Sequence, residues 1–476
     1  MKALTKSNYM TGLSCPKFLW CVFNKPELIP EVDAATRAIF DMGHEIGNWA
    51  KKRYPGGVEI EFKPDATTKT KQALGKRVPI FEASFTYKGT YCKTDILVPI
   101  DDEWDLIEVK SSASVKPEHI EDSAFQSWIL ENCGIKIRRV HVMYVNNEYV
   151  KDGEIDPKQL LVMEDVTEAV QAVLPNVPEN VDAMLAMLRG PMPKTLLGVD
   201  CLDPDNCPVC FPKDADLIEL YYFGKKKWPL INEGIKNVSD LPKGFKLSEK
   251  QLIQCKAMKA KEPYVNRAAL RTFLKELKYP LFLMDFETIH PGVPLFDGTR
   301  PYQQVPFQFS IHVVEEDGKV RQLEFLAEGK NDPRKELIEA LKKIGEKGTV
   351  LAYNAPFEKR VINDLADAFP AEMHWLHGIN DRMVDLIEPF RTFSYYHPNQ
   401  HGSCSLKSVL PAMTGKGYED LEIGDGGLAS IEFMRITYGE VSSEERERVR
   451  KQLLDYCRKD TEALVTLLST LQVVSS

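Results

Sequence analysis

Residues 280–288 read PLFLMDFET, and this stretch decides the fold of the second half of the chain. Leu281 to Met284 is an apolar run of strand length, which predicts a buried strand. Asp285 and Glu287 follow two residues apart, so on a strand their side chains point to the same face. Two such carboxylates repel each other unless a cation lies between them. A divalent ion such as Mg²⁺ is the usual cation, and the alternative is a strand that simply ends in a polar turn.

The bulk composition bounds the class of protein. A chain of 476 residues is expected to form two or three domains. Its 43% hydrophobic and 28% charged residues are typical of a globular protein. The net charge of −9 gives no general attraction to nucleic acid, so such binding would need local basic patches or metal ions. Without a signal peptide or membrane-length run, we expect a cytoplasmic protein with no membrane partner, whose ten cysteines are thiols or metal ligands rather than disulfides.

A period-two pattern between residues 78 and 145 predicts a sheet in the first half. The expected elements are three strands, a helix and a further strand, at Phe81–Tyr87, Tyr91–Ile100, Trp104–Lys110, Pro117–Cys133 and Arg138–Val145. Asp95 lies in the second strand, and Glu108 and Lys110 share one face of the third. If these strands are antiparallel neighbours, Asp95 and Glu108 can hold a metal. Lys110 would then orient a water or stabilise the charge that develops on a phosphate.

This pattern resembles the RecB-like branch of the PD-(D/E)xK nucleases. The matching residues are Asp95, the Glu108-Val109-Lys110 triplet and Gln126 in the following helix. The family also has a histidine ligand on an upstream helix, and His44, within a helix expected over 33–54, fits that place. The resemblance implies an α/β domain over residues 1–214, with a restriction-endonuclease-like mixed sheet and flanking helices. It also implies a Mg²⁺ or Mn²⁺ site at His44, Asp95 and Glu108, with Lys110 and Gln126 as catalytic residues.

Cys201, Cys207 and Cys210 form a C-x5-C-x2-C cluster in a loop rich in Asp and Pro, which indicates a metal site. Iron–sulfur members of the RecB-like nucleases have a similar layout, with one further cysteine near the start of the domain. Cys15 fits that position, and Cys21 competes with it. The resemblance implies a 4Fe–4S cluster. Zn²⁺ is the alternative because tetrahedral thiolate sites suit both, and three buried thiols without metal are the third possibility.

Residues 215–278 are expected to form a helical connector. Its segment YYFGKKKW places Lys225, Lys226, Lys227 and Trp228 together, a combination that suits single-stranded nucleic acid. A solvated loop with partly packed aromatics explains the same letters. The stretch 230–256, with its glycines and prolines, is weakly similar to a helix–hairpin–helix unit.

The second half continues with a predicted hairpin at Phe307–Val314 and Val320–Leu326 around Asp317-Gly318. A strand at 349–353 then leads to Asn354 and to Glu358 near the start of a helix. A long helix from Ser443, which a capping box starts at Ser442, carries Tyr456 and Asp460 at i and i+4, hence on one face.

This order resembles the DnaQ-like exonucleases of the RNase H-like superfamily, in the DEDD branch with a tyrosine in its last motif. Asp285 with Glu287, Asn354 with Glu358, and Tyr456 with Asp460 match the three motifs. The resemblance implies an RNase H-like α/β domain over residues 279–476, Mg²⁺ or Mn²⁺ at Asp285, Glu287, Glu358 and Asp460, and Tyr456 as the catalytic residue that orients the attacking water. Glu358 departs from the aspartate usual in that family.

Together the two halves are similar to a prokaryotic family that joins a RecB-like nuclease domain to a DnaQ-like exonuclease domain. The expected function is a metal-dependent nuclease acting on DNA, single-stranded or with free ends, or on RNA. One alternative is a nucleic-acid-binding factor with degenerate nuclease sites. Another is a nuclease regulated by a redox- or metal-sensing cysteine cluster. Nothing in the sequence indicates an oligomeric state.

Overall fold

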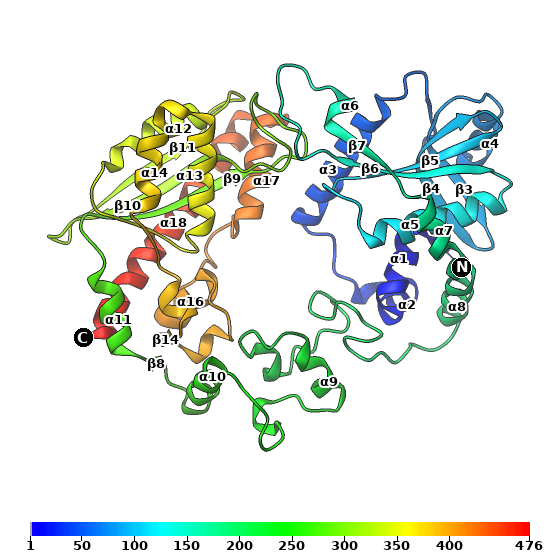
Figure 1. Ribbon diagram of the computed structural model, residues 1–476. Coiled ribbons are helices and arrows are strands. Elements are labelled where there is room, and N and C mark those ends of the chain that lie inside the picture. The colour runs from blue at the N-terminus through cyan, green and yellow to red at the C-terminus, as the bar shows by residue number, and fades with distance from the viewer. Residues whose placement is uncertain (1) are drawn as a thin grey trace. The chain divides into compact units, whose positions relative to one another are not determined.

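The computed structural model describes residues 2–476 and has a mixed α/β architecture (Figure 1). The chain forms two compact units, each with its own sheet. The first unit contains the chain up to Lys213 together with Trp228–Gly234 and Pro291–Tyr302. The second contains Asp214–Lys227, Ile235–His290 and Gln303–Ser476. Among the described residues, no helix is both long and apolar enough to cross a lipid bilayer.

The sheet of the first unit has the order β2-β3-β4-β5-β6-β7, with β1 beside β4. Its strands are β1 (Leu4–Thr5), β2 (Val58–Glu59), β3 (Ile80–Tyr87), β4 (Thr90–Ile100), β5 (Glu103–Lys110), β6 (Ile137–Val145) and β7 (Leu161–Asp165). The predicted antiparallel pairing of the second and third strands is confirmed, because β4 and β5 pair with Ile96 opposite Ile107. Strand β6 is parallel to β5 and is reached through helix α5 (Pro117–Asn132).

Helices cover both faces of this sheet, because alternate side chains of each strand point in opposite directions. On one face, Ile46 and Ala50 of α3 (Ala34–Lys51) pack with Ile107 and Met143. On the other face, Leu106 packs in one core with Val140 and Val142 of β6 and with helices that include α1 (Lys6–Ser14), α2 (Pro16–Asn24), α5, α7 (Thr167–Val173) and α8 (Val177–Arg189). Glu108 and Lys110 follow Leu106 at spacing two, so they lie on the α5 side of β5.

The sheet of the second unit has the order β11-β10-β9-β12-β13. Its strands are β9 (Leu281–Ile289), β10 (Val305–Val314), β11 (Val320–Leu326), β12 (Thr349–Ala352) and β13 (Met383–Asp385). The predicted strand at residues 281–288 and the predicted hairpin are therefore confirmed. Strands β9, β10 and β11 are antiparallel neighbours, whereas β12 runs parallel to β9 and β13.

The two faces of β9 separate the apolar core from the carboxylates. Phe282, Met284 and Phe286 point to one face, where they meet α12 (Arg334–Leu341), α13 (Pro356–Ala368) and α14 (Met373–Asp381). Leu281 and Leu283 point to the other face, where they pack against α18 (Ser443–Ser475). Asp285 and Glu287 have the same parity as these leucines. The fold therefore turns both carboxylates toward α18.

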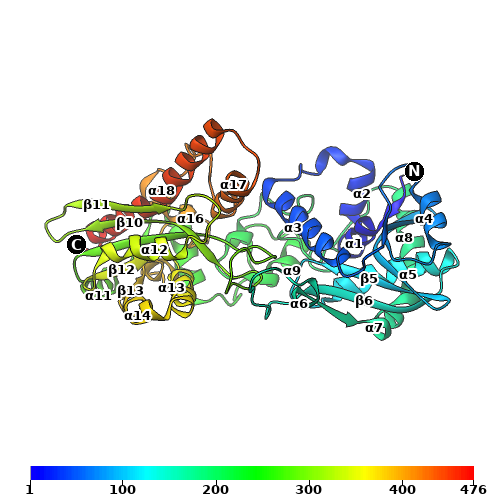
Figure 2. The ribbon, with the colours of Figure 1, turned by 90° about the horizontal axis from the view of Figure 1, so that it is seen from above.

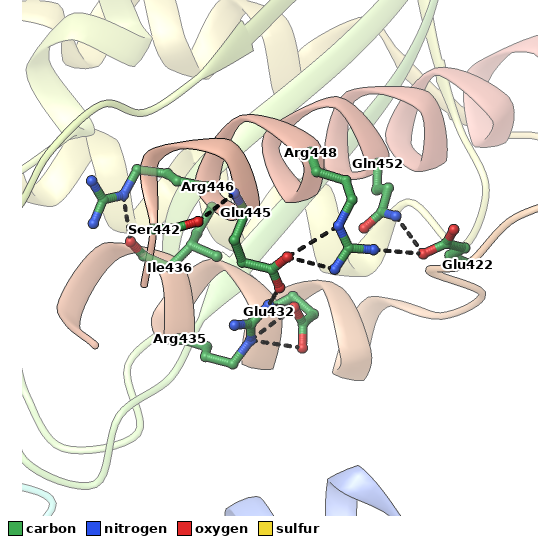
Figure 3. A network of polar contacts seen from close by, with 9 residues as sticks. All are labelled: Glu422, Glu432, Arg435, Ile436, Ser442, Glu445, Arg446, Arg448 and Gln452. Carbon is green, nitrogen blue, oxygen red and sulfur yellow. Dashed lines mark hydrogen bonds and ion pairs between the residues drawn. The ribbon is translucent and has the colours of Figure 1, made fainter. Parts of the chain in front are cut away.

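Helix α18 is anchored at its start (Figure 3). The Ser442 hydroxyl caps it by accepting a hydrogen bond from the Glu445 backbone N–H at 3.2 Å, as predicted. The Glu445 carboxylate also binds Arg448 on α18 and Arg435 on α17 (Gly426–Tyr438), each at 2.7 Å. Single surface ion pairs contribute little, but a connected network fixes geometry better. These contacts hold α17 against α18 and so fix the helix that carries Tyr456 and Asp460.

Further helices and one strand pair complete the two units, and Figure 2 labels α4, α6, α9, α11 and α16 among them. They include α4 (Ala66–Leu74), α6 (Pro157–Leu160), α9 (Lys227–Asn232), α10 (Glu249–Ala260), α11 (Arg267–Lys275), α15 (Glu388–Arg391), α16 (Leu406–Thr414) and the strand pair β8 (Tyr264–Val265) with β14 (Tyr395–Tyr396). Between residues 214 and 248 the backbone forms only 3₁₀ turns and α9. The predicted helical connector is thus largely irregular in its first half and helical from α10 onward.

Candidate active sites

The first unit places Glu108 at the centre of a buried polar cluster. The Glu108 side chain is 1% exposed and accepts hydrogen bonds from Lys110 Nζ at 2.6 Å, Lys6 Nζ at 2.8 Å and Gln126 Nε2 at 2.7 Å. Burial disfavours the carboxylate, but the charges of Lys110 and Lys6 outweigh burial and lower the pKa of Glu108. Glu108 is therefore held as an anion at neutral pH.

Asp122, one turn before Gln126 on α5, completes this cluster. Its carboxylate accepts hydrogen bonds from Lys110 Nζ at 2.5 Å and from Gln126 Nε2 at 3.0 Å. Lys110 consequently bridges Glu108 and Asp122. Burial lowers and the two carboxylates raise the pKa of Lys110, with a net rise. The lysine is fully protonated and can stabilise negative charge, but it is not a base.

Asp95 stands next to this cluster across the β4–β5 pair. Its carboxylate accepts a hydrogen bond from the Val109 backbone N–H at 2.7 Å. Burial and the neighbouring charge of Glu108 raise the pKa of Asp95 to about 7. A cation bound between Asp95 and Glu108 would offset the repulsion between the two carboxylates and favour the ionised form of Asp95. The structure thus brings Asp95, Glu108, Lys110 and Gln126 together.

Gln126 gives an independent sign that a ligand belongs here. Its amide is fully buried and uses Nε2 to bind two carboxylates. Within residues 2–476 its Oε1 atom has no hydrogen-bond partner. A buried acceptor without a donor costs about 1–3 kcal/mol. A water or a metal-bound water between Gln126 and Glu108 would satisfy it, so the residues present fit a hydrated divalent ion.

His44 is the predicted ligand that the structure does not bring to this centre. It is exposed on α3, the helix that packs on the face of β5 opposite to α5. In the described part of the chain, the groups of three or more close metal-ligating side chains include neither His44 nor Asp95 and Glu108. Sequence reasoning also missed Lys6 and Asp122. Asp122 lies at i−4 from Gln126, so a helical-face argument could have found it, whereas no local signal points to Lys6.

The four cysteines Cys15, Cys201, Cys207 and Cys210 lie together, as predicted, and are all buried. Their sulfur atoms are within 4.8 Å of one another, and Cys15 and Cys210 are 3.9 Å apart. Thiol hydrogen bonds from Cys15 and Cys210 lower the pKa of Cys207, so the cluster favours a thiolate. Cys21 is buried elsewhere and is not part of this group. Four convergent sulfurs can bind a metal, and this cluster joins the start of the unit to its end.

In the second unit, Asp285 and Glu287 face α18 and lie within 4.8 Å of each other and of the Cys457 thiol. Burial, then the charge of Asp460, raises the pKa of Asp285 and of Glu287 well above its ordinary value. Glu358 acts on both carboxylates in the same direction. Two buried carboxyl groups whose ionisation is opposed by neighbouring carboxylates form an environment that suits divalent cations.

Glu358 occupies the first turn of α13, as predicted, and is 2% exposed. Burial raises the pKa of Glu358 to about 8. In the described chain its Oε2 atom has no hydrogen-bond partner. Like Asp460, Glu358 does not belong to the group of Asp285, Glu287 and Cys457 whose ligand atoms lie within 4.8 Å. Its free oxygen is therefore a candidate outer ligand rather than part of the tight group.

Asp460 is flanked by two tyrosines. The Tyr418 hydroxyl donates a hydrogen bond to Asp460 Oδ1 at 2.6 Å, and Tyr456 also acts on this carboxylate. Burial, then the charges of Asp460 and Glu287, raises the pKa of Tyr456, so its phenol stays protonated. Lys407 Nζ lies 5.9 Å from the ring centres of both tyrosines and is exposed. Tyr418 and Lys407 were not foreseen, because they come from a loop and a helix that only the fold brings here.

Asn354 has a backbone role at the edge of this centre. Its φ of 69° is in the left-handed region that asparagine tolerates, and its N–H donates to Asp385 Oδ1 at 2.9 Å. The Arg391 guanidinium donates to Asn354 Oδ1 at 3.3 Å. Asn354 thus turns the chain from β12 into α13, and the exposed Asn354 side chain stands beside a cation.

The prediction of a lysine–aromatic platform at residues 225–228 is wrong for two of its four members. Trp228 is 2% exposed and packs against Gly198, where an added Cβ would approach its ring to 3.0 Å. Lys227 is also buried, whereas Lys225 and Lys226 are exposed. A tryptophan without exposed ring faces cannot stack on a base. The exposed aromatic of this segment is Tyr222, at 85%.

Comparisons with known proteins place part of this chain in a broader context. A family model described as a domain of unknown function (DUF2779) matches residues 282–405, which include Asp285, Glu287, Asn354 and Glu358. A solved structure described as the crystal structure of SSO0001 is similar at 11% identity and a TM-score of 0.24, over 44% of this chain and 89% of that chain. No curated protein matches the chain.

Proposed function

We propose that the protein is a metal-dependent nuclease that hydrolyses phosphodiester bonds of DNA, with one centre in each unit. The observation that carries this proposal is the carboxylate cluster of the second unit. Burial and the charge of Asp460 on α18 raise the pKa of Asp285 and of Glu287 on β9, with Tyr456 beside them. Burying several ionised carboxylates together destabilises the folded state unless cations are bound between them. The order of these residues along the chain supports an RNase H-like, DnaQ-like exonuclease unit.

In the second unit, Asp285, Glu287 and Asp460 would hold Mg²⁺ or Mn²⁺, and the oxygen of Glu358 without a partner would reach an ion directly or through water. Bound divalent ions supply an activated water and stabilise the leaving oxygen in phosphodiester hydrolysis. The Tyr456 hydroxyl donates its proton to Asp460, so its oxygen would orient the water by accepting a hydrogen bond from it. Tyr418 fixes Asp460. Lys407 and Arg391 offer positive charge for the phosphates of the substrate.

In the first unit, Asp95 and Glu108 would hold a divalent ion in a restriction-endonuclease-like centre. The Gln126 acceptor without a partner would orient a water bound there. Lys110 stays protonated and stabilises negative charge on the phosphate. His44 has no part in this proposal, because it is exposed on α3, which packs on the opposite face of the sheet.

The four cysteines would hold a structural metal in the first unit. A Zn–S bond of about 2.3 Å gives tetrahedral sulfur separations of about 3.8 Å, and the observed Cys15–Cys210 separation is 3.9 Å. This spacing favours a single ion, Zn²⁺, over the 4Fe–4S cluster, which must fit irons and sulfides between the same sulfurs. Metal analysis with a sulfide assay and the visible absorption spectrum separates the two.

The test is a digestion assay on DNA and RNA labelled at the 5′ or the 3′ end, with Mg²⁺, Mn²⁺ or EDTA. Wild-type protein is expected to degrade DNA only with metal. Lys110→Met should remove the activity of the first unit and Asp285→Asn that of the second, while the double variant is inactive. Asp367→Asn, an exposed aspartate on α13, is the matched control.

Loss of 3′-terminal label in the Lys110→Met protein would assign the exonuclease polarity. Full activity of the double variant would refute the proposal. Tight metal-independent binding of DNA without cleavage would instead support a nucleic-acid-binding factor with degenerate sites, for which the displaced Glu358 is the supporting observation.

A further inference from the structure

The centre of the first unit contains a second lysine, Lys6, which comes from the start of the chain, 102 positions before Glu108. Lys6 Nζ donates a hydrogen bond to Glu108 Oε1 at 2.8 Å and lies 3.8 Å from Asp122 Oδ2. Lys110 binds the same two carboxylates, at 2.6 and 2.5 Å. Both lysine side chains are 23% exposed, whereas Glu108 and Asp122 are buried. Two ammonium groups therefore share one pair of carboxylates.

Lys6 is held in this position by the way helix α1 begins. Lys6 is the first residue of α1, and the Thr5 hydroxyl caps the helix by accepting from the Asn8 N–H at 3.3 Å. Leu4 pairs with Thr90 on β4. One turn on, the Tyr9 ring stacks on Phe125, the neighbour of Gln126, with centroids 4.5 Å apart. Strand pairing, capping and stacking thus fix the residues around Lys6. The backbone of Lys6 is therefore held where its side chain reaches Glu108.

The charges show what Lys6 does in the centre. Three carboxylates, Asp95, Glu108 and Asp122, face two ammonium groups, Lys6 and Lys110, so with all five groups ionised the centre carries one net negative charge. Without Lys6 the same centre would carry two. A divalent ion bound at Asp95 and Glu108 must therefore compete with the Lys6 ammonium for the oxygen of Glu108. In the described chain the buried Oε1 atom of Gln126, beside Glu108, has no hydrogen-bond partner. This atom marks the side of the centre at which a bound ion or its water would find an acceptor.

We propose that Lys6 is a positioning residue of this centre. Its ammonium group holds Glu108 and Asp122 together before a divalent ion arrives, and it gives up the Glu108 oxygen when the ion binds. Lys6 is then a free cation at the edge of the centre, placed for a substrate phosphate. This inference rests on the proposed metal-dependent nuclease centre in the first unit and adds a residue to it.

Helix α1 also connects Lys6 to the cysteine cluster. The helix ends at Cys15, which caps its C-terminus, begins α2 and contributes one of the four sulfurs. Nine helical residues at 1.5 Å each span about 14 Å. One rigid element therefore has the metal-binding cysteine at one end and the centre's second lysine at the other. A metal at the cysteines steadies the helix that presents Lys6.

Mn²⁺ binding measured by electron paramagnetic resonance tests the proposal independently of activity. The full-length protein carries Asp285→Asn and Asp460→Asn, so that the second unit contributes little binding. In this background Lys6→Met and Lys6→Gln are expected to bind Mn²⁺ at least about tenfold more tightly, because a unit charge next to the ion is removed. Lys6→Arg keeps the charge and stays near the background affinity. The matched control is Lys2→Met, an exposed lysine four residues upstream.

Cleavage by the first unit supplies the second readout. Lys6→Met and Lys6→Gln should lower kcat and lower the Mn²⁺ concentration that gives half-maximal rate, a combination that unfolding does not produce. Unchanged or weaker Mn²⁺ binding in both variants overturns the role of Lys6. If instead Mn²⁺ binding tightens but the wild-type centre cuts no nucleic acid, the role of Lys6 stands and the nuclease proposal fails.

Discussion

Replacing Asp285 by asparagine should make the metal-free protein more stable while it removes the activity of the second unit. Asparagine has the shape of aspartate but carries no charge. Asp285 lies within 4.8 Å of Glu287, and burial followed by the charge of Asp460 raises the pKa of Asp285. In the metal-free wild type, the charge of Asp285 is therefore repelled by the neighbouring carboxylates, which lowers the stability of the folded state.

The size of this effect follows from the geometry. Two unit charges 4.8 Å apart repel by about 3 kcal/mol at an effective dielectric constant of about 20. Removing the charge of Asp285 should raise the free energy of unfolding by up to about this amount. For a unit of about 240 residues, 1 kcal/mol shifts Tm by about 2–4 °C. Asp285→Asn is therefore expected to raise the Tm of the second unit by up to about 6–12 °C in EDTA.

The pH dependence has a definite sign. The folded-state pKa of Asp285 is raised above its ordinary value of 3.8. Below pH 3.8 the carboxyl group is protonated in both states and costs nothing. As the pH rises above 3.8, the unfolded state ionises while the folded state resists, so the wild type loses stability. The advantage of Asp285→Asn should therefore be small near pH 4 and grow toward pH 8.

Differential scanning calorimetry with EDTA and with excess Mg²⁺ or Mn²⁺ measures this effect. Metal should stabilise the wild type by about 2.7 kcal/mol at a hundredfold excess over Kd, and Asp285→Asn by much less. Asp367→Asn, exposed on α13, should change neither scan. If Asp285→Asn is less stable than the wild type in EDTA at pH 8, the reasoning from carboxylate repulsion is refuted.

Three further predictions follow from the same structure. Cys207→Ser should abolish metal binding by the cysteine cluster and weaken cleavage by the first unit, while cleavage by the second unit is unchanged. The control is Cys133→Ser, at an exposed cysteine. Equal metal content in the two variants would contradict this prediction. Trp228→Ala should lower the free energy of unfolding by about 3–5 kcal/mol because the side chain is buried. Tyr222→Ala should leave calorimetric scans unchanged, because that side chain is exposed. It should weaken binding of single-stranded DNA by roughly 1–3 kcal/mol, the contribution of one base stacked on an aromatic ring. Tyr456→Phe should slow exonuclease cleavage at least about tenfold without changing the stabilisation by Mn²⁺, and a loss of both would indicate a structural role.

Much of the fold was predictable because strands and helices have different periods of apolar residues, which can be recognised in the sequence. The apolar run before Asp285, the alternation through Glu108 and Lys110, and the cap at Ser442 each predicted an element that the structure contains. The clustering of Cys15 with the three later cysteines was predicted as well, but from a resemblance and not from spacing.

The errors came from burial and from distant contacts. The KKKW segment has the letters of a nucleic-acid platform, but packing against Gly198 buries Trp228. His44 lies on a helix of the expected place and length, yet it remains exposed. A residue type records what a side chain can do, whereas its environment depends on segments far away in the chain.

The sequence alone determined part of the local order: the longer strands of both sheets, which face of β9 carries Asp285 and Glu287, and that Tyr456 and Asp460 share a helical face. These features depend on hydrogen bonds and side-chain directions within a few residues. Only the tertiary structure decided that α18 faces those carboxylates and that Lys6 reaches Glu108 across 102 positions. Such contacts depend on how whole elements pack, because the energy that selects them comes from burial summed over the core. A short segment of sequence does not reveal which distant residues will pack against it, so these contacts could not be derived locally.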